Sequence, residues 1–235
     1  MSVEGRGRVS AERDVRVLVF DLDGTLVPTM EDYADRAAQL MEESFGTPFA
    51  EARRSYFATS GLPFEKQLRQ LYPGQDTDPV AQRFEDWKDG YLTGIAIAPT
   101  TAALLQQWRD RGLLVAISSN NLEHYVERLA HDWPVDCALG YRAPGAGDPG
   151  FAKGEPHFRA IEERFGFDRS AFLFTGDSPN DAHIAAAARV RFRALLTDAF
   201  APDDFERAVP GTRTLTNLAE LGDHIATVAD PVEGL

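Results

Sequence analysis

The sequence predicts an α/β fold, a doubly wound parallel sheet of five strands with an all-helical segment inserted after the first strand. Short, almost continuous apolar runs alternate with helical patterns, and such runs are typical of strands buried on both faces. Strands that alternate with helices favour a parallel sheet with right-handed crossovers. Residues 28–96 break the alternation, because they contain only helical patterns and chain breakers. A chain of 235 residues is long enough for such a domain with an insertion.

The first strand is expected at Val15 to Phe20, a nearly unbroken apolar run. Later runs of the same character predict strands at residues 113–117, 135–139, 171–175 and 192–197. Between them the apolar spacing becomes helical. It does so at Leu122, Tyr125, Val126 and Leu129, and again at Phe158, Ile161 and Phe165. In an open sheet of this kind, ligands bind at the carboxyl ends of the strands.

The insertion carries two helical stripes. The first consists of Met30, Tyr33, Ala34, Ala37 and Met41, and the second of Phe64, Leu68 and Leu71. Because no strand pattern interrupts them, we expect a helical cap domain at residues 28–96. The core domain is then expected to consist of residues 1–27 and 97–235.

Bulk properties restrict the possible partners and location. A formal net charge of −13 argues against a nucleic-acid surface and against an acidic membrane surface. We find no signal-peptide pattern in residues 1–14 and no run of 18 apolar residues, so we expect a cytoplasmic protein. The single cysteine, Cys137, is expected to be buried and fits a reducing compartment. The five histidines show no metal-ligand spacing and are expected to be structural.

The segment after the first strand reads Asp21-Leu22-Asp23-Gly24-Thr25. Two carboxylates two residues apart on a strand-like segment share one face, while the glycine turns the chain away. A carboxylate that attacks phosphorus approaches a group that is already negatively charged. This motif therefore requires nearby cations.

Three later segments bring polar groups to the same edge of the predicted sheet. Asp177 follows the fourth strand, and Asp181 lies one helical turn further on. Converging acidic oxygens suit a hard cation such as Mg²⁺. The second strand delivers Ser118, Ser119 and Asn120, which are typical of a phosphate cradle or of a helix cap. Of the three lysines, only Lys153 lies in the core, where its ammonium could neutralise Asp21.

Together these motifs resemble the haloacid dehalogenase superfamily, in the helical-cap branch that contains phosphoglycolate phosphatases and β-phosphoglucomutases. The resemblance implies a Rossmann-like core and a Mg²⁺-dependent phosphatase that hydrolyses a small phosphorylated metabolite. It implies that Asp21 is the nucleophile and forms an aspartyl phosphate. Asp23 is then the general acid and base, Ser119 binds phosphate, and Lys153 steadies both the nucleophile and the phosphate.

The same resemblance assigns the remaining site residues. Metal ligands are expected at Asp21, Asp23 (through its backbone carbonyl), Asp177 and Asp181, the last either directly or through water. Further substrate contacts are expected at Gly24, Thr25 and Asn120. The sequence departs from the family pattern where Gly154 follows Lys153, and at Leu26-Val27-Pro28-Thr29, where an acidic hinge is usual.

Three alternatives remain. A sugar-phosphate mutase needs a cap-borne site for a second phosphate, with Arg53, Arg54 and Lys66 as candidates. A metal-independent haloacid dehalogenase is disfavoured by Asp23 together with Asp177. A non-catalytic binding module would not need this set of chemical groups. We expect a monomer or a weak homodimer.

Overall fold

The computed structural model describes residues 15–146 and 148–225, so the terminal parts of the predicted core lie outside the described residues. The described chain contains a parallel sheet of six strands in the order β3-β2-β1-β4-β5-β6. The strands are β1 (Val17–Phe20), β2 (Leu114–Leu122), β3 (Cys137–Tyr141), β4 (Phe172–Gly176), β5 (Arg191–Leu195) and β6 (Arg213–Leu215). The predicted fold class is confirmed.

The sheet has one strand more than the five that the sequence predicts. β6 is three residues long and pairs in parallel with β5, with Arg193 opposite Arg213. Only Leu215 of this strand is buried, so the segment does not form the apolar run by which the other strands are recognised. β2 also extends to Leu122, beyond the predicted end, with an irregular register after Ser118.

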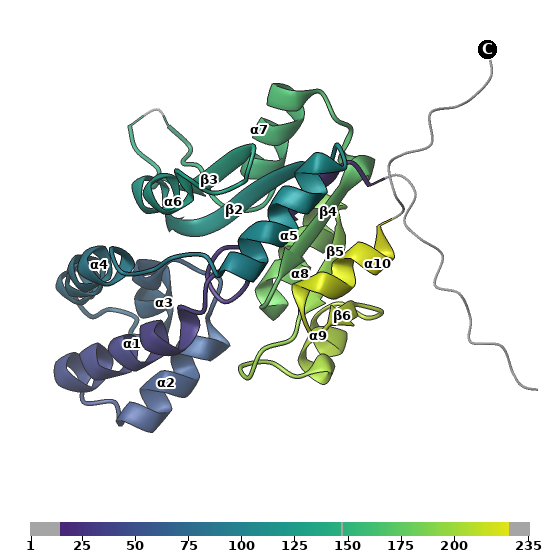
Figure 1. Ribbon diagram of the computed structural model, residues 1–235. Helices are drawn as coiled ribbons and strands as arrows, with labels where there is room; N and C mark the ends of the chain where they lie inside the picture. The colour runs from purple at the N-terminus through teal and green to yellow at the C-terminus, as the bar shows by residue number, and fades with distance from the viewer. Residues whose placement is uncertain (1–14, 147, 226–235) are drawn as a thin grey trace, which may run out of the picture.

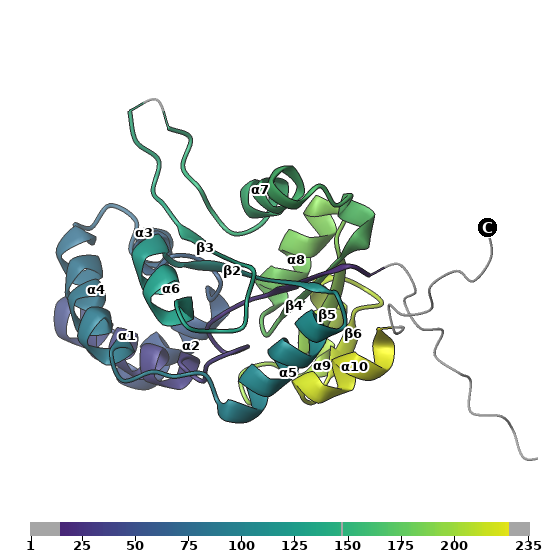
Figure 2. The ribbon, with the colours of Figure 1, turned by 45° about the horizontal axis from the view of Figure 1, so that its top comes forward.

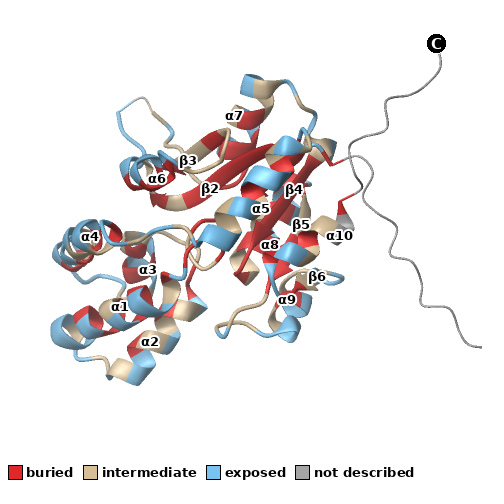
Figure 3. Cartoon of the chain, viewed as in Figure 1, coloured by how far each residue is buried: buried red, intermediate tan, exposed pale blue. Residues whose placement is uncertain are grey.

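Helices cover both faces of the sheet (Figure 2). One face carries α5 (Pro99–Asp110), α6 (Glu123–Ala130) and α10 (Leu221–His224), and the other carries α7 (Glu155–Phe165) and α8 (Pro179–Ala188). α9 (Pro202–Ala208) packs against α8. Side chains of β1 alternate between the two layers: Phe20 stacks on Trp108 of α5 at 5.5 Å between ring centroids, whereas Val19 packs with Phe158 of α7. Figure 3 shows the central strands as the most deeply buried part of the molecule.

The segment between β1 and β2 is helical (Figure 1). It contains α1 (Met30–Phe45), α2 (Phe49–Ala58), α3 (Phe64–Leu71) and α4 (Asp78–Leu92), followed by α5 of the core. The predicted stripes are the buried faces of α1 and α3. Tyr33 of α1 contacts Phe84 and Trp87 of α4 edge to face, so an aromatic cluster joins these two helices. We call α1 to α4, with their connecting turns, the helical insertion.

Polar contacts hold the helical insertion against the core. The turn between α2 and α3 reaches the sheet edge, where the Gly61 carbonyl accepts hydrogen bonds from Asn120 Nδ2 at 2.6 Å and Asn180 Nδ2 at 3.3 Å. Gly61 has φ +85°, and a Cβ there would lie 2.6 Å from Asn180 Nδ2, so glycine is required for this close approach. On the other side, Arg128 of α6 pairs with Asp89 of α4 at 2.9 Å.

Among the described residues, no helix combines the length and the hydropathy that crossing a bilayer demands. Cys137 is 5% exposed at the start of β3, as predicted. Burial raises the pKa of its thiol, which favours the unreactive protonated form.

His157 of α7 is fully buried under β2 and β3. Its Nε2 lies 3.1 Å from the Gly140 carbonyl and its Nδ1 lies 2.9 Å from Ser118 Oγ. Because a carbonyl oxygen only accepts, Nε2 carries the proton and Nδ1 accepts from the Ser118 hydroxyl. Burial lowers the pKa of His157 to about 3. The ring is therefore neutral at physiological pH and serves the structural role expected from the sequence.

The lowered pKa makes a prediction about stability. A folded-state pKa of about 3, below the unfolded value, means that the stability linked to His157 is fully present above pH 6.5 and is lost as the pH falls toward 3. Between pH 7.5 and pH 5.5, the free energy of unfolding of the parent should fall by about 1.4 kcal/mol more than that of His157→Gln, because glutamine does not titrate. Urea unfolding at both pH values measures this difference, and identical pH dependences would contradict a neutral buried imidazole.

Candidate active site

A cavity of about 380 Å³ opens at the carboxyl ends of β1, β2 and β4, beneath the helical insertion. Asp21, Asp23, Ser119, Lys153 and Asp177 all line it. The structure therefore brings together groups from four separate segments, at the edge where a parallel sheet binds ligands.

Lys153 is the central cation of this cavity. Its Nζ lies 2.8 Å from Asp21 Oδ1 and 2.7 Å from Asp181 Oδ1, and its side chain is 3% exposed. Its pKa is raised because the attraction of the two carboxylates outweighs the opposing effect of burial. The ammonium is thus held charged beside Asp21, as the sequence predicts.

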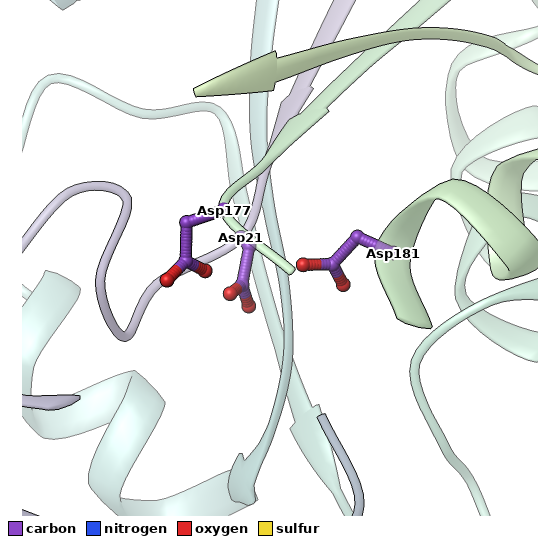
Figure 4. A group of neighbouring side chains, drawn as sticks. All are labelled: Asp21, Asp177 and Asp181. Carbon is purple, nitrogen blue, oxygen red and sulfur yellow. The ribbon is translucent and has the colours of Figure 1, made fainter. Parts of the chain in front are cut away.

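Three buried carboxylates cluster here, and two of them, Asp21 and Asp181, contact the ammonium. Oxygens of Asp21, Asp177 and Asp181 all lie within 4.8 Å of one another, and Figure 4 shows the three side chains converging from β1, the end of β4 and α8. Burial raises the pKa of Asp21 to about 7, against the lowering effect of Lys153. Burial and the neighbouring Asp21 and Asp181 raise the pKa of Asp177 well above its usual range.

This donor set fits a hard divalent cation. Buried carboxylates cost free energy unless they are paired or bind a metal, and one ammonium cannot offset three of them. Asp21 and Asp177 offer oxygens directly to the cavity, and oxygen ligands suit Mg²⁺. Metal ligation by these two residues is therefore consistent with the structure.

Asp181 is placed differently from its neighbours. Its Oδ2 accepts hydrogen bonds from the Ser178 hydroxyl at 2.7 Å and the Ser178 amide at 3.2 Å, and its Oδ1 accepts from Lys153. These bonds form a capping box that begins α8, and Asp181 does not line the cavity. These contacts show that Asp181 orients Lys153, while its expected part in metal binding, directly or through water, stays a prediction.

Gly24 and Thr25 lie behind the cavity wall rather than on it. Gly24 has φ +83°, and a Cβ there would meet Asp177 Oδ2 at 2.1 Å. The Thr25 hydroxyl is buried and has no hydrogen-bond partner in the described part of the chain. The turn at Gly24 directs the chain away from the cavity, so the structure does not bring these two predicted substrate contacts to it.

Asp23 is held by two groups that the sequence interpretation did not assign. Its Oδ1 accepts from Thr29 Oγ1 at 2.7 Å, and its Oδ2 accepts from Asn121 Nδ2 at 3.3 Å. Thr29 occupies the segment where an acidic hinge is usual. The Thr29 hydroxyl, four residues beyond the end of the Asp21–Thr25 motif, was the available signal, but its partner could not be predicted from spacing.

The end of β2 separates two adjacent serines. Ser119 lines the cavity, while Ser118 turns to His157 in the layer below, which supports the predicted choice of Ser119. Asn120 also lines the cavity, but its amide is engaged by protein. Its Nδ2 donates to Gly61 of the helical insertion, and its Oδ1 accepts from the Lys153 amide at 3.1 Å. Asn120 therefore connects the insertion to the segment that carries the ammonium.

Comparison with known proteins agrees with this arrangement. A family model described as haloacid dehalogenase-like hydrolase matches residues 18–186. A phosphoglycolate phosphatase from Haemophilus influenzae is 25% identical over 189 residues, which cover 74% of this chain and 84% of that protein. A phosphoglycolate phosphatase from Rhodospirillum rubrum is 26% identical over 191 residues, covering 74% of this chain and 77% of that protein.

Solved structures show the same fold. A hydrolase from Pseudomonas syringae aligns with a TM-score of 0.70 at 19% identity and covers 90% of this chain and 100% of its own. A haloacid dehalogenase-like family protein from Streptococcus pneumoniae aligns with a TM-score of 0.70 at 17% identity, covering 89% and 98%. The arrangement of sheet and helical insertion is therefore shared with these proteins.

Removing the ammonium should destabilise the metal-free protein in a pH-dependent way. Because the pKa of Asp21 is raised to about 7, this side chain is protonated at low pH and does not repel the neighbouring carboxylates. The repulsion grows as the pH rises through that value and Asp21 ionises. We expect Lys153→Met to lower the free energy of unfolding by about 3 kcal/mol or more at pH 8, and by clearly less at pH 5.

Denaturant unfolding in EDTA at the two pH values provides the measurement. Lys66→Met, which removes an exposed lysine of α3, is the matched control and should change stability little at either pH. An equal loss at pH 5 and pH 8 for Lys153→Met would argue that the ammonium does not balance these carboxylates.

Proposed function

The chain belongs to the haloacid dehalogenase-like hydrolase family, and we propose that it is a Mg²⁺-dependent phosphatase that hydrolyses a small phosphate monoester through Asp21. The observation that carries the proposal is the buried contact of Lys153 with Asp21, in a cavity that Asp23, Ser119 and Asp177 also line. The names of the relatives make 2-phosphoglycolate one compound to include in a substrate panel.

In the proposed reaction, an Asp21 carboxylate oxygen attacks phosphorus while the bond from phosphorus to the ester oxygen breaks. Asp23, which Thr29 and Asn121 hold in place, gives its proton to the departing oxygen. Asp23 then takes a proton from water, whose oxygen attacks phosphorus while the bond from phosphorus to the Asp21 oxygen breaks, which releases inorganic phosphate and restores the Asp21 carboxylate. One acid and base group at one position therefore serves both steps.

The other groups bind and position. Lys153 favours the ionised form of Asp21 and offsets charge on the phosphoryl oxygens, and Ser119 offers its hydroxyl to one of them. Asp21, Asp177 and the Asp23 backbone carbonyl would hold Mg²⁺, which supplies further charge compensation for the phosphoryl group. The helical insertion covers the cavity and limits the access of bulk water.

Hydrolysis is favoured over phosphate transfer within a sugar phosphate. A mutase needs a second phosphate site on the insertion, and none of Arg53, Arg54 and Lys66 lines the cavity. Arg53 is already paired with Glu31 and Asp35 on the outer surface. Lys66 lies 5.1 Å from the ring centroid of Tyr141. Arg53 and Lys66 therefore have other partners, and Arg54 does not line the cavity.

We expect Asp21→Asn to lower kcat for p-nitrophenyl phosphate at least about a thousandfold, because an amide cannot act as the nucleophile. Steady-state kinetics in Mg²⁺ with the purified protein measures this loss. Asp203→Asn, which removes an exposed carboxylate from α9, should keep full activity. Unchanged turnover in Asp21→Asn would exclude Asp21 as the nucleophile.

Metal binding can be followed without turnover. Replacing EDTA by saturating Mg²⁺ should raise the Tm of the parent protein by about 3 °C or more, since a ligand of the folded state stabilises it. In Asp177→Asn we expect a smaller increase together with a higher Tm in EDTA, because one repelling carboxylate is gone. An undiminished Mg²⁺ shift in this variant would show that Asp177 is not a ligand.

A further inference from the structure

The face that the helical insertion turns to the cavity carries more negative than positive charge. We call the cavity-lining residues of the insertion the cap wall, and the departing organic group faces it once phosphate occupies the core side. Its charged members in the described structure are Glu65, Arg69, Asp78, Glu85 and Lys88. Their formal charges sum to −1, so the wall as a whole does not attract an anion.

Lys88 is the one deeply buried cation of the cap wall among the described residues, and its charge is already compensated. Its side chain is 8% exposed, and Nζ lies 2.9 Å from the carboxylate of Glu85, one turn earlier in α4. The ring centroids of Tyr33, Phe84 and Tyr125 lie 5.4–5.6 Å from the same nitrogen. A carboxylate and three aromatic faces therefore surround the ammonium.

The second cation lies at the mouth of the cavity and is also paired. Arg69 contacts Asp78 at 3.1 Å, with side-chain exposures of 58% and 74%, so solvent screens this pair. Glu65 accepts a hydrogen bond from the Tyr141 hydroxyl at 3.3 Å, and its charge acts on Arg69 of the same helix. An acidic group on the substrate would therefore find no uncompensated cation on the cap wall as described.

A neutral hydrogen-bonding group does project into the cavity. Tyr56 of α2 is 4% exposed and lines the cavity, and its hydroxyl has no hydrogen-bond partner among the described residues. Burial, with the nearby charges of Asp23, Glu85 and Asp177, raises its pKa well above the usual value. The phenol thus stays protonated and lies between the carboxylates of the core and Glu85. It can donate to, and accept from, a hydroxyl of the substrate.

We propose that Glu85, by neutralising Lys88, makes the cavity select phosphate esters whose organic part is uncharged and hydroxyl-bearing over esters that carry a carboxylate. This selection rests on the proposed phosphatase activity. Tyr56 and the Lys88–Glu85 pair supply donors and acceptors for hydroxyl groups, and the faces of Tyr33 and Phe84 pack against carbon-bound hydrogens. A substrate carboxylate would instead meet the Glu85 charge at short range with little water to screen it.

The test compares two esters that differ only in this group, 2-hydroxyethyl phosphate and 2-phosphoglycolate. We expect the parent protein to show a kcat/KM about tenfold higher for the neutral ester. Glu85→Gln frees the Lys88 ammonium and should raise kcat/KM for 2-phosphoglycolate about tenfold relative to kcat/KM for 2-hydroxyethyl phosphate. Asp86→Asn removes the same charge from the adjacent, exposed position and is the matched control.

Lys88→Gln provides a second, opposite change. It leaves Glu85 uncompensated, so the ratio of the two kcat/KM values should shift further toward the neutral ester. A purely structural role for the pair would lower both values alike in both variants. Preference of the parent protein for 2-phosphoglycolate, or an unchanged ratio in Glu85→Gln and Lys88→Gln, would overturn the proposal.

Failure of the underlying activity is distinguishable from failure of the selection. If the protein does not hydrolyse p-nitrophenyl phosphate in Mg²⁺, or if Asp21→Asn hydrolyses it equally well, the proposed phosphatase function is wrong. If that hydrolysis depends on Asp21 but the ester preference is reversed, only the role given to Glu85 is wrong.

Discussion

The ammonium of Lys153 lies between the buried carboxylates of Asp21 and Asp181, and the rest of the site depends on this contact. The nucleophile must be ionised, yet burial raises the pKa of Asp21 to about 7 and therefore opposes ionisation. Lys153 lowers this pKa but leaves it at about 7, so the ammonium alone does not complete the ionisation of Asp21 at neutral pH. Since Asp177 adds a further carboxylate, the site remains short of positive charge, and a divalent cation is the natural complement.

The two parts of the chain contribute different properties to the cavity. Strand ends of the sheet, with the segment before α7, supply the groups proposed to act on phosphorus, and they are fixed by parallel pairing and by buried layers on both faces. The helical insertion supplies an aromatic and hydrogen-bonding wall without an uncompensated cation among its described residues. Charge is therefore concentrated where phosphate would lie and balanced where the organic group would lie.

Much of the fold and of the candidate site was predictable from sequence, because motifs at the carboxyl ends of parallel strands converge at one edge of the sheet. The positions of Asp21 and Asp177 follow from that rule, whereas the choice of Ser119 and the role of Lys153, which lies in the segment before α7, also needed the family resemblance. What remained hidden depends on which partner a polar group finds in three dimensions. The capping box that occupies Asp181, and the two protein bonds that occupy the Asn120 amide, are examples. β6 was missed because only one of its three residues, Leu215, is a buried apolar side chain.

The tight approach of Gly61 to Asn180 limits how this protein can change over evolution. Any larger residue at that position would push the turn between α2 and α3 off the sheet edge. The adjoining Leu62 and Pro63 line the cavity and face no such restriction from the core side chains that hold Gly61. Mutant libraries that aim to redirect the enzyme without rebuilding its chemistry should therefore vary Leu62 and Pro63 and leave Gly61 in place.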